Sequence, residues 1–129
     1  MALDPLPEIL FSSRTIQEAR PSDPFGGVDW SVEYHNSLAS TQTRAKELGM
    51  NGTERAVVVA GRQTEGRGRR DRRWESPGDG LYFSLLYRPR LAGPDLPFLG
   101  LAAVLAVESA VREKTGISPD VKWPNDLLL

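Results

Sequence analysis

Hydrophobic and polar positions along the chain predict short strands that are separated by helices and loops. Four segments either alternate apolar and polar residues or contain runs of β-branched residues, as strands do, namely residues 28–35, 56–60, 81–87 and 121–123. The last three residues, 127–129, are apolar and strand-like as well. Two interpretations of this end stay open: a terminal strand tucked into the sheet, or a natural sequence that continues beyond Leu129.

Two further segments are predicted to be helices. Ser40 or Thr41 can cap a short helix that runs to about residue 48, and Gly49 is expected to stop it. The clearest helix is predicted over residues 98–114, which carry apolar side chains on most faces. The succession strand, helix, strand, strand, helix, strand predicts an α/β or α+β domain, with a sheet that has its helices on one side.

Residues 1–27 are predicted to be an N-terminal extension and linker, and residues 28–129 to be the main domain. The Pro- and Gly-rich residues 20–27 indicate the linker. The extension holds too little helical sequence for a DNA-reading helix-turn-helix, so no DNA-binding domain is expected. The N-terminus lacks the pattern of a secretory signal, and no apolar run approaches the length of a membrane span. We therefore expect a cytoplasmic protein without membrane contact.

Composition narrows the chemistry that the chain can perform. The 129 residues have a formal net charge of −1, which argues against a supercharged nucleic-acid binder. There is no cysteine, which removes disulfides, thiolate catalysis and Cys-based zinc sites. The single histidine, His35, cannot form a His-rich metal site.

The first candidate site is the long, exposed loop predicted over residues 61–80. Six arginines lie between Arg62 and Arg73, opposed by Glu65 and Asp71. Glycines let backbone N–H groups approach a ligand closely, and guanidinium groups bind carboxylates and phosphates through paired hydrogen bonds. The pattern therefore suits an anionic ligand such as a nucleotide. The alternative is a solvated basic loop or an RNA-binding Arg/Gly tract, although the cluster does not repeat and lies between two predicted strands.

Two further candidate sites are smaller. Pro124 presents Asn125 and Asp126 just past a strand end, where an Asn amide can contact a purine edge and an Asp carboxylate can bind Mg²⁺. The alternative there is an ordinary turn. Hydroxyls and an amide can also satisfy a small polar ligand among apolar side chains, and the residues that offer them are Ser40, Thr41 and Gln63. The alternative is a helix cap and a surface position.

In their order and approximate spacing, these motifs resemble the biotin protein ligase family across residues 30–129. The matching segments are residues 40–42, 57–59, 63, 66–74, 76–77, 81–84 and 122–126. The Arg/Gly motif and the Lys-Trp-Pro-Asn-Asp motif are strongly specific as a pair in this order. The resemblance implies a fold related to class II aminoacyl-tRNA synthetases and lipoate ligases, which is a mixed, largely antiparallel sheet with helices on one face.

The resemblance also implies an activity and a set of functional residues. The family makes biotinyl-5′-AMP from biotin and Mg·ATP, and then passes biotin to a lysine of a biotin carboxyl carrier protein, as in acetyl-CoA carboxylase. The implied biotin-binding residues are Ser40, Thr41, Gln42, Gln63, Gly66, Arg67, Gly68 and Arg69. The implied ATP-binding residues are Arg69, Arg70, Trp74, Lys122, Asn125 and Asp126. Arg69 and Arg70 would be catalytic, and Asp126 would assist Mg²⁺.

The sequence departs from the family pattern at three points. Gln42 stands where the family has Asn, and Asp71 stands where it has Gly, so a polar contact and the phosphate affinity of the loop are expected to change. The family continues beyond the equivalent of Leu129 into a second lysine, a further core strand and usually a small β-barrel. We therefore expect the 129 residues to be nearly inactive unless a continuation or another chain completes them. A lipoate ligase, an inactive ligand- or RNA-binding fragment and a homodimer remain open alternatives.

Overall fold

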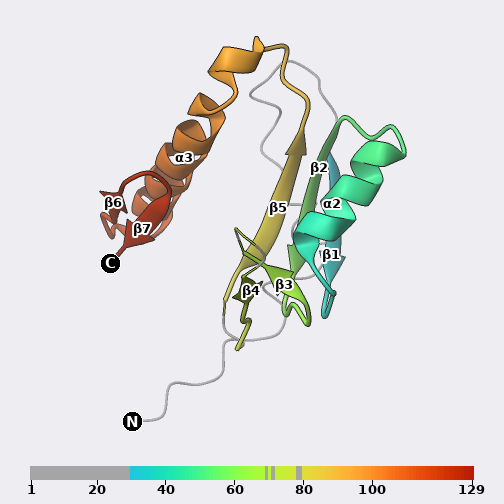
Figure 1. Ribbon diagram of the computed structural model, residues 1–129. Coiled ribbons are helices and arrows are strands. Elements are labelled where there is room, and N and C mark those ends of the chain that lie inside the picture. Colours follow the sequence, from blue (N-terminus) through green and yellow to red (C-terminus); the bar gives the residue numbers. More distant parts are fainter. Residues whose placement is uncertain (1–29, 69, 71, 78–79) are drawn as a thin grey trace. The chain divides into compact units, whose positions relative to one another are not determined.

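The computed structural model describes residues 30–129 except 69, 71, 78 and 79 (Figure 1). The chain divides after Arg88 into two compact units, and each is described by itself. The predicted N-terminal extension and the start of the first predicted strand lie outside the described residues.

The first unit contains a three-stranded sheet with the order β1-β2-β5. Its strands are β1 (Ser31–His35), β2 (Arg55–Ala60) and β5 (Tyr82–Tyr87). β1 and β2 are parallel, whereas β2 and β5 are antiparallel. A tight hairpin cannot join two parallel neighbours, and helix α2 (Thr41–Met50) provides the crossover between them. The predicted mixed sheet is thus confirmed in this unit.

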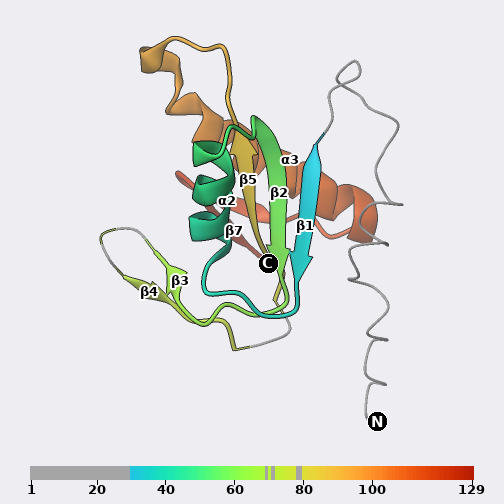
Figure 2. The same cartoon turned by 90° about the vertical axis from the view of Figure 1, so that its right-hand side faces the viewer.

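Helix α2 covers one face of this sheet (Figure 1 and Figure 2). The register aligns Glu33, Val58 and Ser84 across the three strands, and both Glu33 and Ser84 bond to side chains of α2. Because side chains alternate along a strand, Ala56 shares this face with Val58, and neither exposes any surface to solvent. Ala45 is buried on the helix side. The buried side chains between β2 and α2 are therefore small or β-branched.

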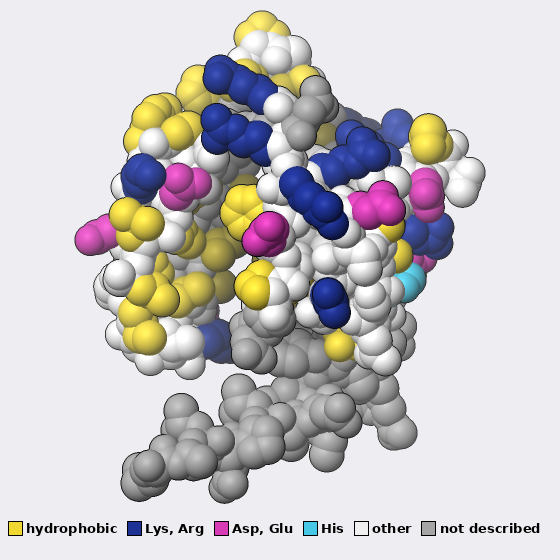
Figure 3. All heavy atoms as spheres, turned by 60° about the horizontal axis from the view of Figure 1, so that its bottom comes forward, with side chains coloured by type: hydrophobic (Ala, Val, Ile, Leu, Met, Phe, Trp, Pro, Cys, Tyr) yellow, Lys and Arg dark blue, Asp and Glu magenta, His cyan; other side chains and the backbone are white. Residues whose placement is uncertain are grey.

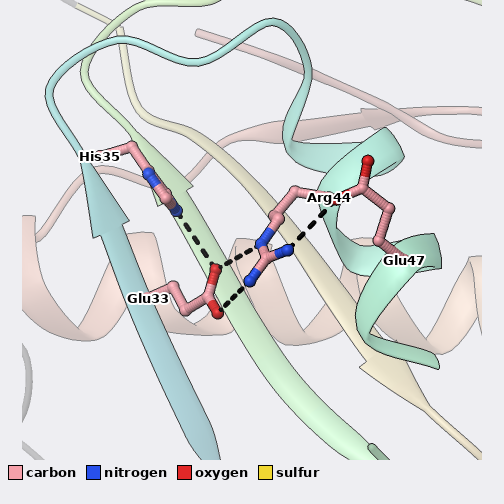
Figure 4. A network of polar contacts seen from close by, with 4 residues as sticks. All are labelled: Glu33, His35, Arg44 and Glu47. Atoms are coloured by element: carbon pink, nitrogen blue, oxygen red, sulfur yellow. Dashed lines mark hydrogen bonds and ion pairs between the residues drawn. The ribbon is translucent and has the colours of Figure 1, made fainter. Parts of the chain in front are cut away.

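A charged network ties α2 to β1 on the same face (Figure 4). Nε of Arg44 donates to Oε2 of Glu33 at 2.8 Å, and Nη2 donates to Oε1 at 2.9 Å, so two hydrogen bonds join the guanidinium and the carboxylate. Nη1 of Arg44 donates to Glu47 at 3.2 Å, and Nε2 of His35 lies 3.2 Å from Oε2 of Glu33. Chiefly through the hydrogen bond from Arg44, this network lowers the pKa of Glu33 below its ordinary value.

The predicted stop of α2 at Gly49 is wrong, because the helix continues past it and Asn51 is the C-cap. The chain turns instead at Gly52, whose φ of 92° lies in the region that favours glycine. The N–H of Gly52 donates to the carbonyl oxygen of Gly49 at 3.2 Å, and that of Thr53 donates to Leu48 at 3.0 Å. These two bonds form a Schellman ending, which satisfies carbonyl groups of the last turn.

Gly49 serves packing rather than a turn. It is buried within the helix, and a Cβ there would lie 3.2 Å from Cδ1 of Leu86 on β5. Nη2 of Arg88 donates to the carbonyl oxygen of Gly49 at 2.6 Å. The missing side chain therefore lets the helix approach the sheet closely.

Residues 61–80 do not form one long exposed loop. Two short strands, β3 (Gly66–Arg67) and β4 (Arg73–Trp74), pair antiparallel within this segment. Gly66 is buried at their contact. Strands of two residues are too short for an alternating pattern to reveal them, which explains why the sequence predicted a loop.

The second unit combines one long helix with a β-hairpin. It contains the 3-10 turn η3 (Gly93–Asp95), helix α3 (Phe98–Thr115) and the antiparallel strands β6 (Asp120–Lys122) and β7 (Asp126–Leu128). Gly116 ends α3 with a φ of 73°. The long helix and both C-terminal strands expected from the sequence are confirmed, although Trp123 falls just outside β6.

By length and composition alone, the segment Gly93–Thr115 could cross a membrane. This finding corrects the expectation that no apolar run approaches such a length. Glu108, Arg112 and Glu113 lie in its second half, and Nη1 of Arg112 is 3.4 Å from Oε1 of Glu108. Because the core helix of a globular protein meets the same criterion, length and composition do not by themselves place the chain in a membrane.

We expect Glu33→Gln to destabilise the protein more than Glu47→Gln, because Glu33 accepts two hydrogen bonds from Arg44 and Glu47 accepts one. The folded-state pKa of Glu33 is lowered. Its contribution to stability is therefore complete above the ordinary Glu pKa of about 4.3 and is lost as the pH falls below that value. Urea unfolding near neutral pH and near pH 3 measures both effects. A gap between the parent protein and Glu33→Gln that widens in acid would contradict the assignment.

Candidate functional site

The parallel pairing of β1 and β2 continues beyond the carboxyl ends of both strands. The N–H of Leu38 donates to the carbonyl oxygen of Arg62 at 3.0 Å, and the N–H of Thr64 donates to that of Leu38 at 3.0 Å. Leu38 and Gln63 thereby form an isolated parallel bridge. These bonds hold the segment before α2 against the segment after β2, and they bring Gln63 to the start of the helix.

The first turn of α2 uses this neighbour. Ser40 is the N-cap, as predicted, and its Oγ accepts from the N–H of Thr43 at 3.4 Å. The N–H of Thr41 has no partner within the helix and donates to Oε1 of Gln63 at 2.8 Å. Oγ1 of Thr41 donates to the same oxygen at 3.1 Å and lies 2.9 Å from Oγ of Ser84. The predicted group of hydroxyls and amide is therefore assembled, with Ser40 and Thr41 only 3% and 4% exposed.

These groups line a cavity of about 350 Å³. Six of the residues expected to bind ligands lie in its wall, namely Ser40, Thr41, Gln42, Gln63, Arg67 and Trp74. Residues 80–84 complete the lining. Buried hydroxyls beside aromatic side chains are the kind of lining that holds a small, largely neutral molecule in a fixed orientation.

Strand β5 supplies a part of this wall that the sequence did not assign to the site. Exposed and less exposed residues alternate along β5, and Ser84 is a polar residue on the less exposed side. A hydroxyl in such a position needs a hydrogen-bond partner, which Thr41 provides. That mismatch between a polar residue and an inward position is the signal from which sequence reasoning could have found Ser84.

A second cavity, of about 650 Å³, runs along the Arg/Gly hairpin and is lined by residues 64–68 together with Arg72 and Arg73. Arg67 lines both cavities, which are therefore neighbours. Nη2 of Arg73 donates to the carbonyl oxygen of Thr64 at 3.1 Å and fastens the base of the hairpin. Several guanidinium groups around one cavity suit a carboxylate or a phosphate.

Of the two arginines expected to be catalytic, the structure describes Arg70. This residue is exposed and has a φ of 55°, in the left-handed region that residues other than glycine seldom adopt. Arg69 and Asp71 lie outside the described residues. On the face shown in Figure 3, Lys and Arg side chains have Asp and Glu side chains among them.

The Lys-Trp-Pro-Asn-Asp motif, residues 122–126, forms the turn of the β6–β7 hairpin in the second unit. Lys122 and Asp126 are register partners, and Nζ of Lys122 lies 3.6 Å from Oδ2 of Asp126. The turn between them contains Asn125 and the indole of Trp123, which is 73% exposed. The structure thus brings Lys122, Asn125 and Asp126 together at one turn. The turn that the sequence offered as the alternative is present, and the binding of a ligand at this turn stays a prediction.

Known proteins match most of the chain. Residues 34–129 match the model of the biotin/lipoate A/B protein ligase family. The chain is 46% identical over 98 residues to the bifunctional ligase/repressor BirA of Bacillus subtilis, an alignment that covers 74% of this chain and 30% of that protein. It is 35% identical over 92 residues to the biotin–[acetyl-CoA-carboxylase] ligase of Paracoccus denitrificans, with 70% and 38% covered.

The fold of this chain is also similar to that of solved biotin protein ligases. The biotin protein ligase from Aquifex aeolicus in complex with biotin and ATP is similar with a TM-score of 0.67 and 40% identity, over 77% of this chain and 41% of that chain. The chain therefore spans between 30% and 41% of the length of these relatives. The predicted fold class is confirmed by this likeness.

We expect Gly66→Ala to destabilise the hairpin and Gly68→Ala to destabilise it less. A Cβ at Gly66 would lie 2.5 Å from the backbone oxygen of Trp74, whereas one at Gly68 would lie 3.3 Å from that of Arg72. Overpacking costs about 1–3 kcal/mol, so Gly66→Ala should lower the free energy of unfolding by that amount. Urea unfolding followed by tryptophan fluorescence measures the change. Equal effects of the two substitutions would show that the close approach at Gly66 does not matter.

Proposed function

The chain belongs to the biotin/lipoate A/B protein ligase family, and on that basis we propose that it acts in the ATP-dependent attachment of biotin to protein. An oxygen of the biotin carboxylate attacks the α-phosphorus of ATP, so that biotinyl-5′-AMP forms and pyrophosphate leaves. The amine of a carrier lysine then takes the biotinyl group, and AMP leaves. Support comes from relatives named for biotin ligation and from a structural neighbour solved with biotin and ATP.

The observation that carries this proposal is the 350 Å³ cavity at the start of α2. It brings together residues that are far apart in the sequence and that the family resemblance assigns to biotin or ATP. In the proposed site, the ring system of biotin occupies this cavity, against Ser40, Thr41, Gln42 and Gln63. The segment Gly66–Arg67 is proposed to hold the ring system as well, Gly68 is a further proposed biotin-binding residue, and Arg69 is proposed to bind the biotin carboxylate.

The arginines of the hairpin are proposed to act by charge and position. Arg69 bridges the biotin carboxylate and the phosphate, and Arg70 supports the phosphate charge. Groups that are fixed in place before the reaction stabilise the negative charge that spreads in the transition state. The protein needs no nucleophilic side chain, because the biotin carboxylate is the nucleophile. A chain without cysteine and with one histidine can therefore support this reaction.

Trp74 and Asn125 are proposed to line the adenine side of ATP, Lys122 is proposed to bind ATP as well, and Asp126 would assist Mg²⁺. No cluster of three or more acidic or histidine side chains exists among the residues that the structure describes. Mg²⁺ nevertheless fits this chain, because it is usually bound by one or two carboxylates together with substrate phosphates. When bound, Mg²⁺ supplies positive charge to the phosphate oxygens, and Asp126 would exchange its contact with Lys122 for the ion.

The proposed protein partner is the biotin carboxyl carrier protein of a biotin-dependent carboxylase, and the proposed location is the cytoplasm. The Paracoccus relative is named for acetyl-CoA carboxylase, which matches this partner. The Bacillus relative is also named a repressor. The segment in which we expect no helix-turn-helix, residues 1–27, lies outside the described residues.

A titration of the chain with biotin, lipoate and a short RNA at two salt concentrations tests this assignment. The family includes lipoate ligases, but the lipoyl ring has no N–H or C=O group with which to use the hydroxyls and amide of the cavity. We expect saturable binding of biotin that changes little with salt, and no comparable binding of lipoate. Binding of RNA that weakens steeply with salt, without binding of biotin, would establish the alternative of an RNA-binding fragment.

In the full-length parent protein, we expect Arg69→Ala to slow the formation of biotinyl-5′-AMP about 10²–10³-fold, because it removes a donor aimed at the developing charge. Arg72→Ala is the matched control, since Arg72 is exposed and lines the 650 Å³ cavity without lining the 350 Å³ cavity proposed for biotin. Biotin-dependent release of pyrophosphate measures both rates. Similar rates for the two variants would remove Arg69 from its proposed role.

A further inference from the structure

Three side chains from three different elements form a continuous hydrogen-bonded row at the cavity. Oγ of Ser84 on β5 lies 2.9 Å from Oγ1 of Thr41 on α2, and Oγ1 of Thr41 lies 3.1 Å from Oε1 of Gln63 beyond β2. The backbone N–H of Thr41 also donates to Oε1 of Gln63 at 2.8 Å. All three residues line the cavity proposed for biotin.

The positions of the protons in this row follow from the chemistry of its groups. A backbone N–H can only donate, so the atom of Gln63 that faces Thr41 must be the carbonyl oxygen of the amide. That oxygen can only accept, so the single hydroxyl proton of Thr41 points to Gln63. Oγ1 of Thr41 must then accept from Ser84, and Ser84 is the donor of the bond that joins the two hydroxyls.

This order of protons determines what the row offers to a ligand. The amide nitrogen of Gln63 is turned away from Thr41 and carries two N–H groups, and it lies 3.2 Å from the place that a Cβ at Gly66 would take. The hydroxyl of Ser84 uses its proton on Thr41 and keeps its lone pairs as acceptors. The wall therefore presents the acceptor lone pairs of Ser84 and, beside them, polar groups of fixed direction, which suit a neutral ligand that carries N–H and C=O groups.

We propose that Ser84 is a positioning residue, which donates to Oγ1 of Thr41 and so holds that hydroxyl in the cavity wall, beside the Gln63 amide that the backbone N–H of Thr41 orients. This inference deepens the proposed function and rests on it, because the ureido ring of biotin carries the adjacent C=O and N–H groups. Ser84 stands on β5, so the strand that is antiparallel to β2 helps to set the recognition of the ligand.

The first arm of the test examines the hydrogen bond without any ligand. The single variants Thr41→Val and Ser84→Ala and the double variant are unfolded with urea. If the two hydroxyls are bonded, the double variant loses less free energy of unfolding than the sum of the single losses, because the second deletion has no bond left to break. Strictly additive losses would overturn the proposed row.

The second arm measures the affinity of the chain for biotin. Removal of one neutral hydrogen bond is expected to weaken binding about fivefold to tenfold in Ser84→Ala. Ser84→Thr keeps a hydroxyl and should restore most of the affinity, which a general structural disturbance would not permit. Ser31→Ala is the matched control, because Ser31 is an exposed serine on β1 and lies outside the cavity wall.

The two arms separate the possible failures. If the parent chain binds biotin and Ser84→Ala binds it equally well, the positioning role of Ser84 is wrong. If Ser84→Thr binds as weakly as Ser84→Ala, the effect does not come from the hydroxyl and the inference is overturned. If the two hydroxyls are coupled but the parent chain does not bind biotin, the proposed function is wrong. Biotin is then also wrong as the ligand of this cavity, whereas the hydrogen bond between Ser84 and Thr41 is still supported.

Discussion

Parallel pairing of β1 and β2 is the constraint on which the first unit depends. Parallel neighbours need a crossover, and the ten-residue helix that provides it has to begin near the carboxyl end of β1, beside the carboxyl end of β2. The continued pairing through Leu38 and Gln63 fixes where that beginning lies. As a result, the backbone N–H of Thr41 meets a side chain that is 22 positions away in the sequence. Ligands commonly bind at the carboxyl ends of parallel strands, and the cavity of this chain follows that tendency.

The first unit also separates neutral from charged chemistry. Buried hydroxyls and an amide line the smaller cavity, whereas guanidinium groups line the larger one, and Arg67 takes part in both. These two linings match a molecule that has a neutral ring at one end and a carboxylate at the other. Two anions that must approach each other need positive charge at the point of contact, and a buried neutral ring needs hydrogen bonds instead. The same short stretch of chain, from Gln63 to Arg73, serves both needs.

The sequence predicted the elements that are long enough to show a period. The β-branched run of β2, the capped start of α2 and the apolar helix α3 all have such a pattern, and the structure contains them. It did not predict the strands β3 and β4, because two residues carry no period. It misplaced the end of α2, because Gly49 and Gly52 look alike in a sequence and differ only in what surrounds them.

The candidate site was predictable in its composition but not in its geometry. Family motifs named Ser40, Thr41 and Gln63, yet only the folded chain shows that one oxygen of Gln63 accepts from both the backbone and the hydroxyl of Thr41. Ser84 was missed because its role depends on which side of β5 faces the helix. That property is set by the pairing with β2, which acts over a long distance in the sequence.

The close contact between Gly49 and Leu86 limits how this sequence can diverge. A side chain at position 49 would meet the tip of the Leu86 side chain rather than backbone. A larger residue at position 49 can therefore be accommodated by a smaller residue at position 86. Sequences that carry alanine or serine at position 49 should therefore tend to carry a smaller residue at position 86. Gly52 is constrained by its backbone angle instead, and its substitutions should be independent of the sheet. These two glycines, one inside α2 and one just beyond its C-cap, should thus show different patterns of covariation among homologues.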